Sequence, residues 1–134
     1  MNFDARDRTF KVWSYSVTHR SLLLRSDSDL SLKAAPRIEV CADGVQVMFL
    51  RPLMKGLAIR RISDGEEADT VARKYGINEY LDRIFLFEST SGEGLIVSGN
   101  PSWAKAACPI EAPSFFSRPG EVRQYPDATA GQIE

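Results

Sequence analysis

The chain of 134 residues has few side chains that bind metal ions. It contains one histidine, His19, and two cysteines, Cys41 and Cys108, which lie far apart in the sequence. A structural zinc site needs four nitrogen or sulfur ligands, and a calcium loop needs an Asp-x-Asp-x-Asp-Gly pattern that this sequence lacks. We therefore expect no metal site and no cofactor.

Excess charge and long apolar runs are also absent. The 17 basic and 18 acidic residues leave a net charge of −1, which gives no overall field to attract nucleic acid or an anionic membrane. The longest apolar stretches, such as Val45–Leu50, have the length of a strand, and Met1–Arg8 has no apolar core of a signal peptide. We expect a cytoplasmic protein with reduced cysteines and no membrane contact.

What is present suits a globular domain. Hydrophobic residues make up 43% and charged residues 26%, which is enough apolar surface for a packed core at this length. We expect one α+β domain over residues 1–106. Residues 107–134 hold four of the seven prolines and predict an irregular extension, packed on the domain through Phe115 and Phe116.

Alternating residues predict a first hairpin from Phe10–Val17 and Leu22–Arg25, with a loop over Thr18–Ser21 favoured over a two-residue turn. Its register sets Val17 opposite Leu22 and Tyr15 opposite Leu24. Phe10 and Val12 then fall on the polar face, which implies a bulge or a covered end there. The predicted core face consists of Trp13, Tyr15, Val17, Leu22 and Leu24.

A polar connector over Asp27–Ala35 leads to a second predicted hairpin, Arg37–Cys41 with Val45–Leu50, closed at Asp43-Gly44. Its outer face includes Met48 and Leu50 and is too apolar for a solvated surface. We expect the domain's own helix or tail, or else a partner, to cover it.

The middle of the chain predicts one helix among further strands. Ser63 to Glu66 reads as a capping box, apolar residues recur at helical spacing to Tyr75, and Gly76 ends the helix. Further strands are predicted at Gly56–Ile62, Ile84–Phe87 and Leu95–Val97. The predicted fold class is α+β: a mainly antiparallel, strongly curved or barrel-like sheet of about seven short strands, one amphipathic helix and an irregular C-terminal tail.

Catalytic patterns are weak. His19 is the only histidine, the residue type that most often acts as a base near neutral pH, and its place in a turn is typical of a solvated surface residue. Ser98 lacks the flanking glycines of a nucleophile elbow, and Ser91–Gly94 joins two strands instead of opening a helix as phosphate loops do. The sequence therefore favours a protein without catalytic activity.

These observations favour a non-catalytic binding or protein-interaction module. The expected occupant is a protein partner or a second copy more than a small ligand, bound through Met48, Leu50, Phe115 and Phe116. The alternative is a small-ligand protein or enzyme with a pocket near His19 and Arg25. A lesser alternative is a binder of single-stranded nucleic acid through Arg60 and Arg61, although alternation places these two on opposite faces of a strand.

Overall fold

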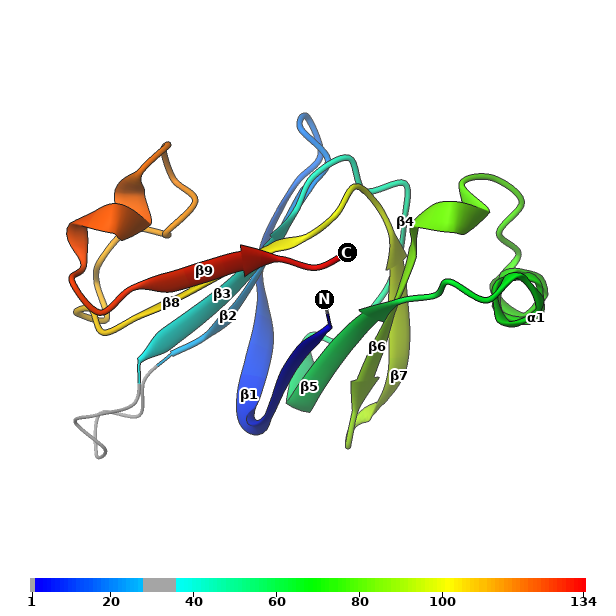
Figure 1. Cartoon of the computed structure of the whole chain (residues 1–134), viewed down its shortest axis with the longest axis horizontal. Helices are drawn as coiled ribbons and strands as arrows, with labels where there is room; N and C mark the ends of the chain where they lie inside the picture. The colour runs from blue at the N-terminus through cyan, green and yellow to red at the C-terminus, as the bar shows by residue number, and fades with distance from the viewer. Residues whose placement is uncertain (1, 28–35) are drawn as a thin grey trace.

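A computed structural model describes residues 2–27 and 36–134 of the chain (Figure 1). Most of the predicted connector, residues 28–35, lies outside the described residues. The described strands are β1 (Phe3–Ser16), β2 (Ser21–Ser26), β3 (Arg37–Ala42), β4 (Val47–Phe49), β5 (Leu53–Arg61), β6 (Ile84–Ser89), β7 (Gly92–Val97), β8 (Ser102–Ala106) and β9 (Thr129–Gln132). The described helices are α1 (Gly65–Tyr75) and the short 3₁₀ helices η1 (Leu81–Arg83) and η2 (Glu121–Gln124).

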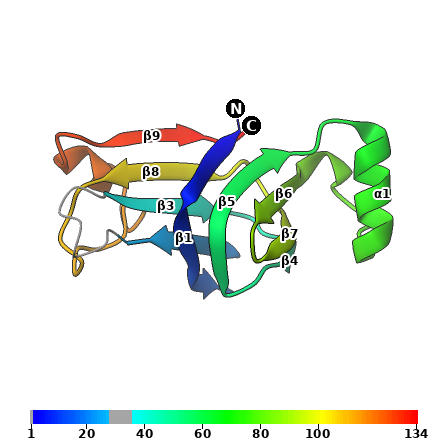
Figure 2. The same ribbon diagram turned by 90° about the horizontal axis from the view of Figure 1, so that it is seen from below.

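All nine described strands form one antiparallel sheet in the order β4-β7-β6-β5-β1-β2-β3-β8-β9. Helix α1 lies at one end of the molecule and the segment between β8 and β9 lies at the other (Figure 2). The α+β class and the antiparallel pairing are confirmed. The sheet is open and not strongly curled, so the predicted barrel-like curvature is wrong, and about seven strands was too few.

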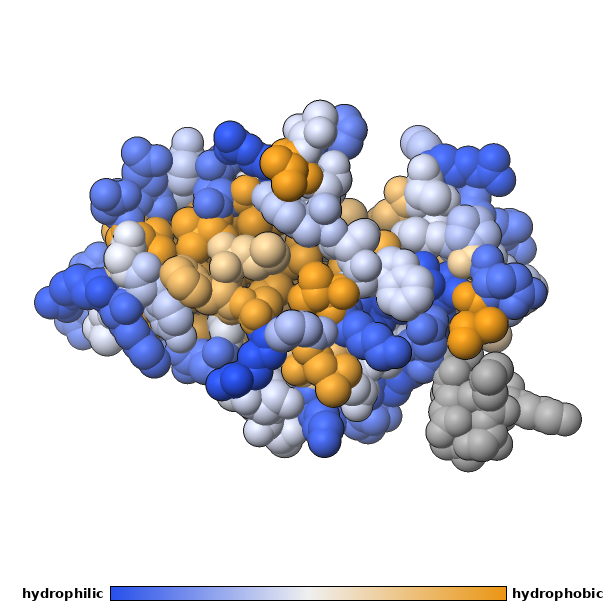
Figure 3. All heavy atoms as spheres, turned by 180° about the vertical axis from the view of Figure 1, so that it is seen from behind, coloured by the Kyte–Doolittle hydropathy of each residue, from blue (hydrophilic) through white to orange (hydrophobic). Residues whose placement is uncertain are grey.

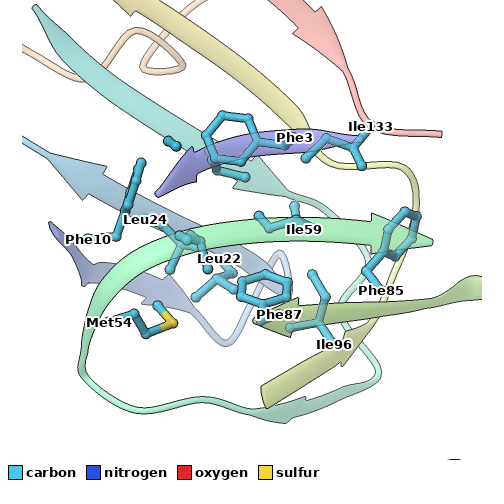
Figure 4. Packing of buried hydrophobic residues seen from close by; sticks show 14 of the residues in the cluster. Phe3, Phe10, Leu22, Leu24, Met54, Ile59, Phe85, Phe87, Ile96 and Ile133 are labelled. Carbon is cyan, nitrogen blue, oxygen red and sulfur yellow. The ribbon is translucent and has the colours of Figure 1, made fainter. Parts of the chain in front are cut away.

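One face of the sheet carries the main hydrophobic core (Figure 4), and we call it the inner face and the opposite one the outer face. Leu57 and Ile59 of β5 are both fully buried there. Phe3 meets Phe10 edge to face, with ring centroids 5.9 Å apart. Ile133, next to the end of the chain, is also fully buried in this core, so the segment after β9 helps to close it.

Helix α1 covers the outer face of the β6–β7 half of the sheet. Ala68, Val71 and Ala72 are buried against apolar residues of β6 and β7, as the helical spacing predicts. The helix ends at Gly76, whose φ of 70° is the left-handed conformation expected of a C-terminal glycine. Its N-cap is Asp64, which accepts from the amide of Glu66, so the predicted cap at Ser63 is one residue too early. No helix in the described ranges has the length and hydropathy to span a membrane.

The segment after β8 covers the outer face of the other half. Phe115 is 3% exposed and packs with Ala104 and Ala106 of β8, and its ring meets Tyr125 edge to face. Strand β9 follows and pairs with β8. The C-terminal region is therefore not irregular throughout: it supplies an edge strand that its proline-rich composition did not indicate.

A bulge reverses the predicted faces of β1. Ser14 lies opposite Leu23 and Val12 lies opposite Leu24, so β1 has one extra residue between these pairs. Side chains before the bulge therefore exchange faces relative to the predicted alternation. Phe10 is fully buried, whereas Trp13 is 47% and Tyr15 is 37% exposed. The implied bulge is confirmed, but the prediction that Trp13, Tyr15 and Val17 form a core wall is wrong.

The second predicted hairpin does not form. Strand β3 pairs with β2 and β8, and β4 pairs with β7 at the far edge of the sheet. Gly44 adopts a φ of 65°, which suits the Asp-Gly turn signal, but the chain then leaves β3. The amide of Val45 donates to the carbonyl of Arg20, and that of Gln46 donates to the carbonyl of Val97. Through these two bonds the chain passes from the β3 half of the sheet to the β7 half.

Candidate functional site

The described residues form an open groove of about 750 Å³. It lies between the outer face of β1, β2 and β3 and residues 114–123 of the C-terminal segment. We call the strand side the floor and residues 114–123 the wall.

Hydroxyl groups dominate the floor. Ser16 pairs with Ser21 across the β1–β2 hairpin, and Ser14 pairs with Leu23. These four residues line the groove together with Cys41 of β3. Ser21 donates from its hydroxyl to Asp43 Oδ1 at 2.6 Å, and the hydroxyl of Ser16 accepts from the backbone amide of His19. The floor therefore presents these polar groups beside the apolar side chains of Leu22 and Leu23.

The wall is apolar at its base and charged at its rim. Phe115 is buried, and Phe116 and Val122 are half-buried and line the groove. Arg118 donates to Glu121 Oε2 at 2.6 Å, so its charge is compensated. Arg123 lines the groove, is exposed, and forms no ion pair with any residue that the structure describes.

Arg37 holds the first part of this segment. The side chain is 1% exposed and donates to the backbone carbonyls of Pro109, Ile110, Ala112 and Pro113 at 2.8 to 3.2 Å. An irregular segment lacks the internal bonds of a helix, so its buried carbonyls need donors from elsewhere. The guanidinium group, with five N–H donors in a plane, can serve several of them at once.

Glu39 fixes the position of the wall. Its Oε1 accepts from the hydroxyl of Ser114 and from the amide of Phe115, both at 2.8 Å, and its Oε2 accepts from Arg25 Nε at 2.9 Å. Arg25 lies beneath Trp13, with the guanidinium carbon 3.8 Å from the ring centroid. Glu39 is fully buried, so its charge depends on Arg25 and on Arg37, whose Nη1 is 3.7 Å from Oε2.

One ion pair of this cluster is imperfect. Arg37 Nε and Asp27 Oδ1 lie 3.4 Å apart, and neither atom has a hydrogen-bond partner among the described residues. The two charges still compensate each other at this distance. The buried side chains of Arg25, Arg37 and Glu39 and the partly exposed side chain of Asp27 thus form a network of two cations and two anions under the C-terminal segment, which we call the clamp.

One thiol, that of Cys41, lies in the groove. Burial, followed by the negative charges of Asp43 and Glu39, raises the pKa of the Cys41 thiol to about 11, so this thiol is protonated at neutral pH. Burial also raises the pKa of Cys108. The groove lining contains no histidine that would activate a hydroxyl. Within residues 2–27 and 36–134, no cluster of three His, Cys, Asp or Glu side chains could hold a metal ion.

The predicted site residues do not all meet in this groove. Phe115 and Phe116 line it. His19 lies in the exposed loop after β1, and Arg25 is buried in the clamp, so the structure does not bring this predicted pair together in the groove. Met48, on the edge strand β4, is 37% exposed, whereas Leu50 is half-buried against the main core.

Sequence reasoning missed the floor of the groove. The alternating Ser14 and Ser16 were visible as one polar face, but their role depends on a wall that comes from residues 114–123. Comparison of the chain with known protein families, with curated proteins and with solved structures finds no match.

Proposed function

We propose that this chain is a non-catalytic protein-interaction module that holds a segment of a partner protein in the groove. The observation that supports this proposal is the groove itself, a large open cavity whose wall is anchored by the clamp. A site that is already formed loses little conformational entropy when it binds, which favours affinity.

The lining favours a peptide segment over a compact small molecule. The groove spans three strands and carries side chains of both charges that form no ion pair with the described residues: Asp43 lies at its β3 side, and Arg123 lies on its wall. Leu23, Phe116 and Val122 offer apolar contact between these charges. An amphipathic peptide with charged and apolar side chains can match all of these groups at once.

The proposal is tested by selecting binders from a random peptide library displayed on phage. Affinities of the selected peptides are then measured by calorimetry for the unmodified chain and for Phe116→Glu. The matched control is Phe49→Glu, because Phe49 is 45% exposed on β4 and does not line the groove. We expect Phe116→Glu to raise Kd about tenfold or more and Phe49→Glu to leave it unchanged.

Two outcomes would overturn this proposal. One is a library that yields no binder. The other is a set of binders that are insensitive to both Phe116→Glu and Arg123→Glu while circular dichroism shows that both variants are folded. Arg123 is exposed, so its replacement tests the groove without disturbing the wall.

A second candidate is partner docking on the β4 edge. Met48, Phe49 and Leu53 are all exposed apolar residues in this region. In the view from behind, apolar side chains gather in the left half of the picture (Figure 3). Binders that are lost in Phe49→Glu and retained in Phe116→Glu would favour this surface over the groove.

A further inference from the structure

We infer that the partner segment binds as an additional β-strand along the outer edge of Trp13–Ser16. This inference rests on the proposed function and specifies how the groove is occupied. The segment is an extended peptide whose backbone pairs with β1 and whose alternate side chains enter the groove.

The first support is an edge inside the sheet that has no strand beside it. Strand β5 pairs with β1 as far as Lys11, opposite Leu53, and the amide of Val12 donates to the carbonyl of Pro52. Pro52 has no amide hydrogen and β5 begins only after it, so the pairing ends there. Beyond this point, β2 is the only strand among the described residues that pairs with β1.

The consequence is a free row of backbone groups. Trp13–Ser16 spans about 13 Å at the rise of a β-strand. One side of this segment bonds to β2, and the other presents N–H and C=O groups that a further strand can satisfy. Strand β1 pairs with β5 between Phe3 and Lys11 and with β2 over Lys11–Ser16, so Trp13–Ser16 is the end of β1 that has no neighbour on the β5 side, and this end borders the groove.

The second support is the position of the side chains on this edge. Ser14, Tyr15 and Ser16 all line the groove. A strand added at this edge would therefore direct every second side chain toward the groove. Exposed Trp13 is held by its contact with Arg25, 3.8 Å from the ring centroid, and it flanks the edge as a rigid apolar surface. Aromatic side chains placed this way are frequent in binding surfaces.

The third support concerns the occupant's chemistry. Leu23 of the floor and Phe116 of the wall both line the groove, so we expect an apolar side chain at a position of the peptide that enters there. Arg118 is compensated by Glu121, whereas Arg123 has no ion pair among the described residues, so we expect an acidic side chain toward Arg123. The occupant is thus an extended peptide with apolar and acidic residues on one face.

The test uses the tightest peptide selected from the phage library. Each of its backbone amides is methylated in turn, which removes one donor and leaves the side chain in place. We expect Kd to rise about tenfold or more at every second residue and to change little between them, because a strand bonds to its neighbour through alternate residues. Hydrogen exchange at the amides of Trp13–Ser16 is measured with and without the same peptide, and we expect it to slow in the complex.

The outcomes separate this inference from the proposed function. Suppose that methylation has no periodic effect and the Trp13–Ser16 amides gain no protection, while Phe116→Glu still weakens binding. The peptide then occupies the groove in another way, and only the strand addition is wrong. If the chain alone sediments as a dimer and these amides are already protected, a second copy occupies the edge, and this inference is overturned.

Discussion

Two segments cover the outer face of the sheet, helix α1 and the C-terminal segment, and we call them the helical cover and the irregular cover. They differ in how their backbone hydrogen bonds are satisfied. Helix α1 bonds its amides to its carbonyls internally and needs only apolar contacts, which Ala68, Val71 and Ala72 provide. The segment over residues 109–115 has no such internal ladder. It depends on Arg37 for its carbonyls and on Glu39 for the Phe115 amide. An irregular cover therefore requires buried charge beneath it, whereas a helical cover does not.

This difference also explains the position of the groove. Apolar side chains of α1 pack directly onto β6 and β7. The C-terminal segment is held at a few points, by the clamp and by Phe115, and beside these points the floor remains open. The candidate site therefore lies under the irregular cover.

The largest effect is expected when the clamp loses its carboxylate. Glu39→Ala would leave Arg25 and Arg37 buried without their shared anion and the Phe115 amide without an acceptor. Breaking a buried ion pair by removing one partner costs about 3–5 kcal/mol. We expect the free energy of unfolding, measured by urea denaturation, to fall by about this amount.

The matched control lies on the helical side. Glu67 of α1 accepts from Arg60 at 2.8 Å through two bonds, but both side chains are partly exposed. Exposed pairs contribute between about 0 and 1 kcal/mol, so we expect Glu67→Ala to cost little. Equal losses in Glu39→Ala and Glu67→Ala would mean that the clamp is no more important than a surface pair.

Local patterns in the sequence predicted the helical side well. The spacing of Ala68, Val71 and Ala72 and the stop at Gly76 depend only on near neighbours in the chain, and the structure confirms them. The tail side depends on contacts between residues far apart. Nothing near Arg37 in the sequence indicates that its side chain bonds to carbonyls of residues 109–113.

Two further differences arise from single-residue effects. The bulge between Val12 and Ser14 adds one residue, and because side chains alternate with a period of two, it places Phe10 in the core and leaves Trp13 outside it. The Asp43-Gly44 turn signal was real, but a three-residue strand such as β4 has few ladder bonds, so distant contacts with β7 decided its partner. The groove could not be predicted because it requires both the bulge and the tail.

A smaller effect is expected at the N-terminus of the helical cover. Asp64→Ala removes the oxygen that accepts from the Glu66 amide and the negative charge at the positive end of the helix. Loss of such a cap costs about 1 kcal/mol. Urea denaturation should show this loss, and Asp64→Asn should recover most of it because the amide oxygen can still cap. A loss as large as that of Glu39→Ala would contradict the comparison between the two covers.

The last effect is absent at neutral pH and belongs to the tail side alone. The pKa of Cys41 rises from the ordinary 9.0 to about 11 in the folded chain. Below pH 9 the thiol is protonated in both states and contributes nothing. Between about pH 9 and 11 the unfolded chain releases this proton and the folded chain retains it, so stability falls as the pH rises. Denaturation of the Cys108→Ala chain, with and without Cys41→Ala, isolates this thiol. We expect the chain that retains Cys41 to lose stability relative to its partner variant above pH 9. If the difference in free energy of unfolding between the two chains stayed constant from pH 8 to 11, the Cys41 thiol would be as well solvated in the folded chain as in the unfolded chain. The C-terminal segment would then not shield it from water.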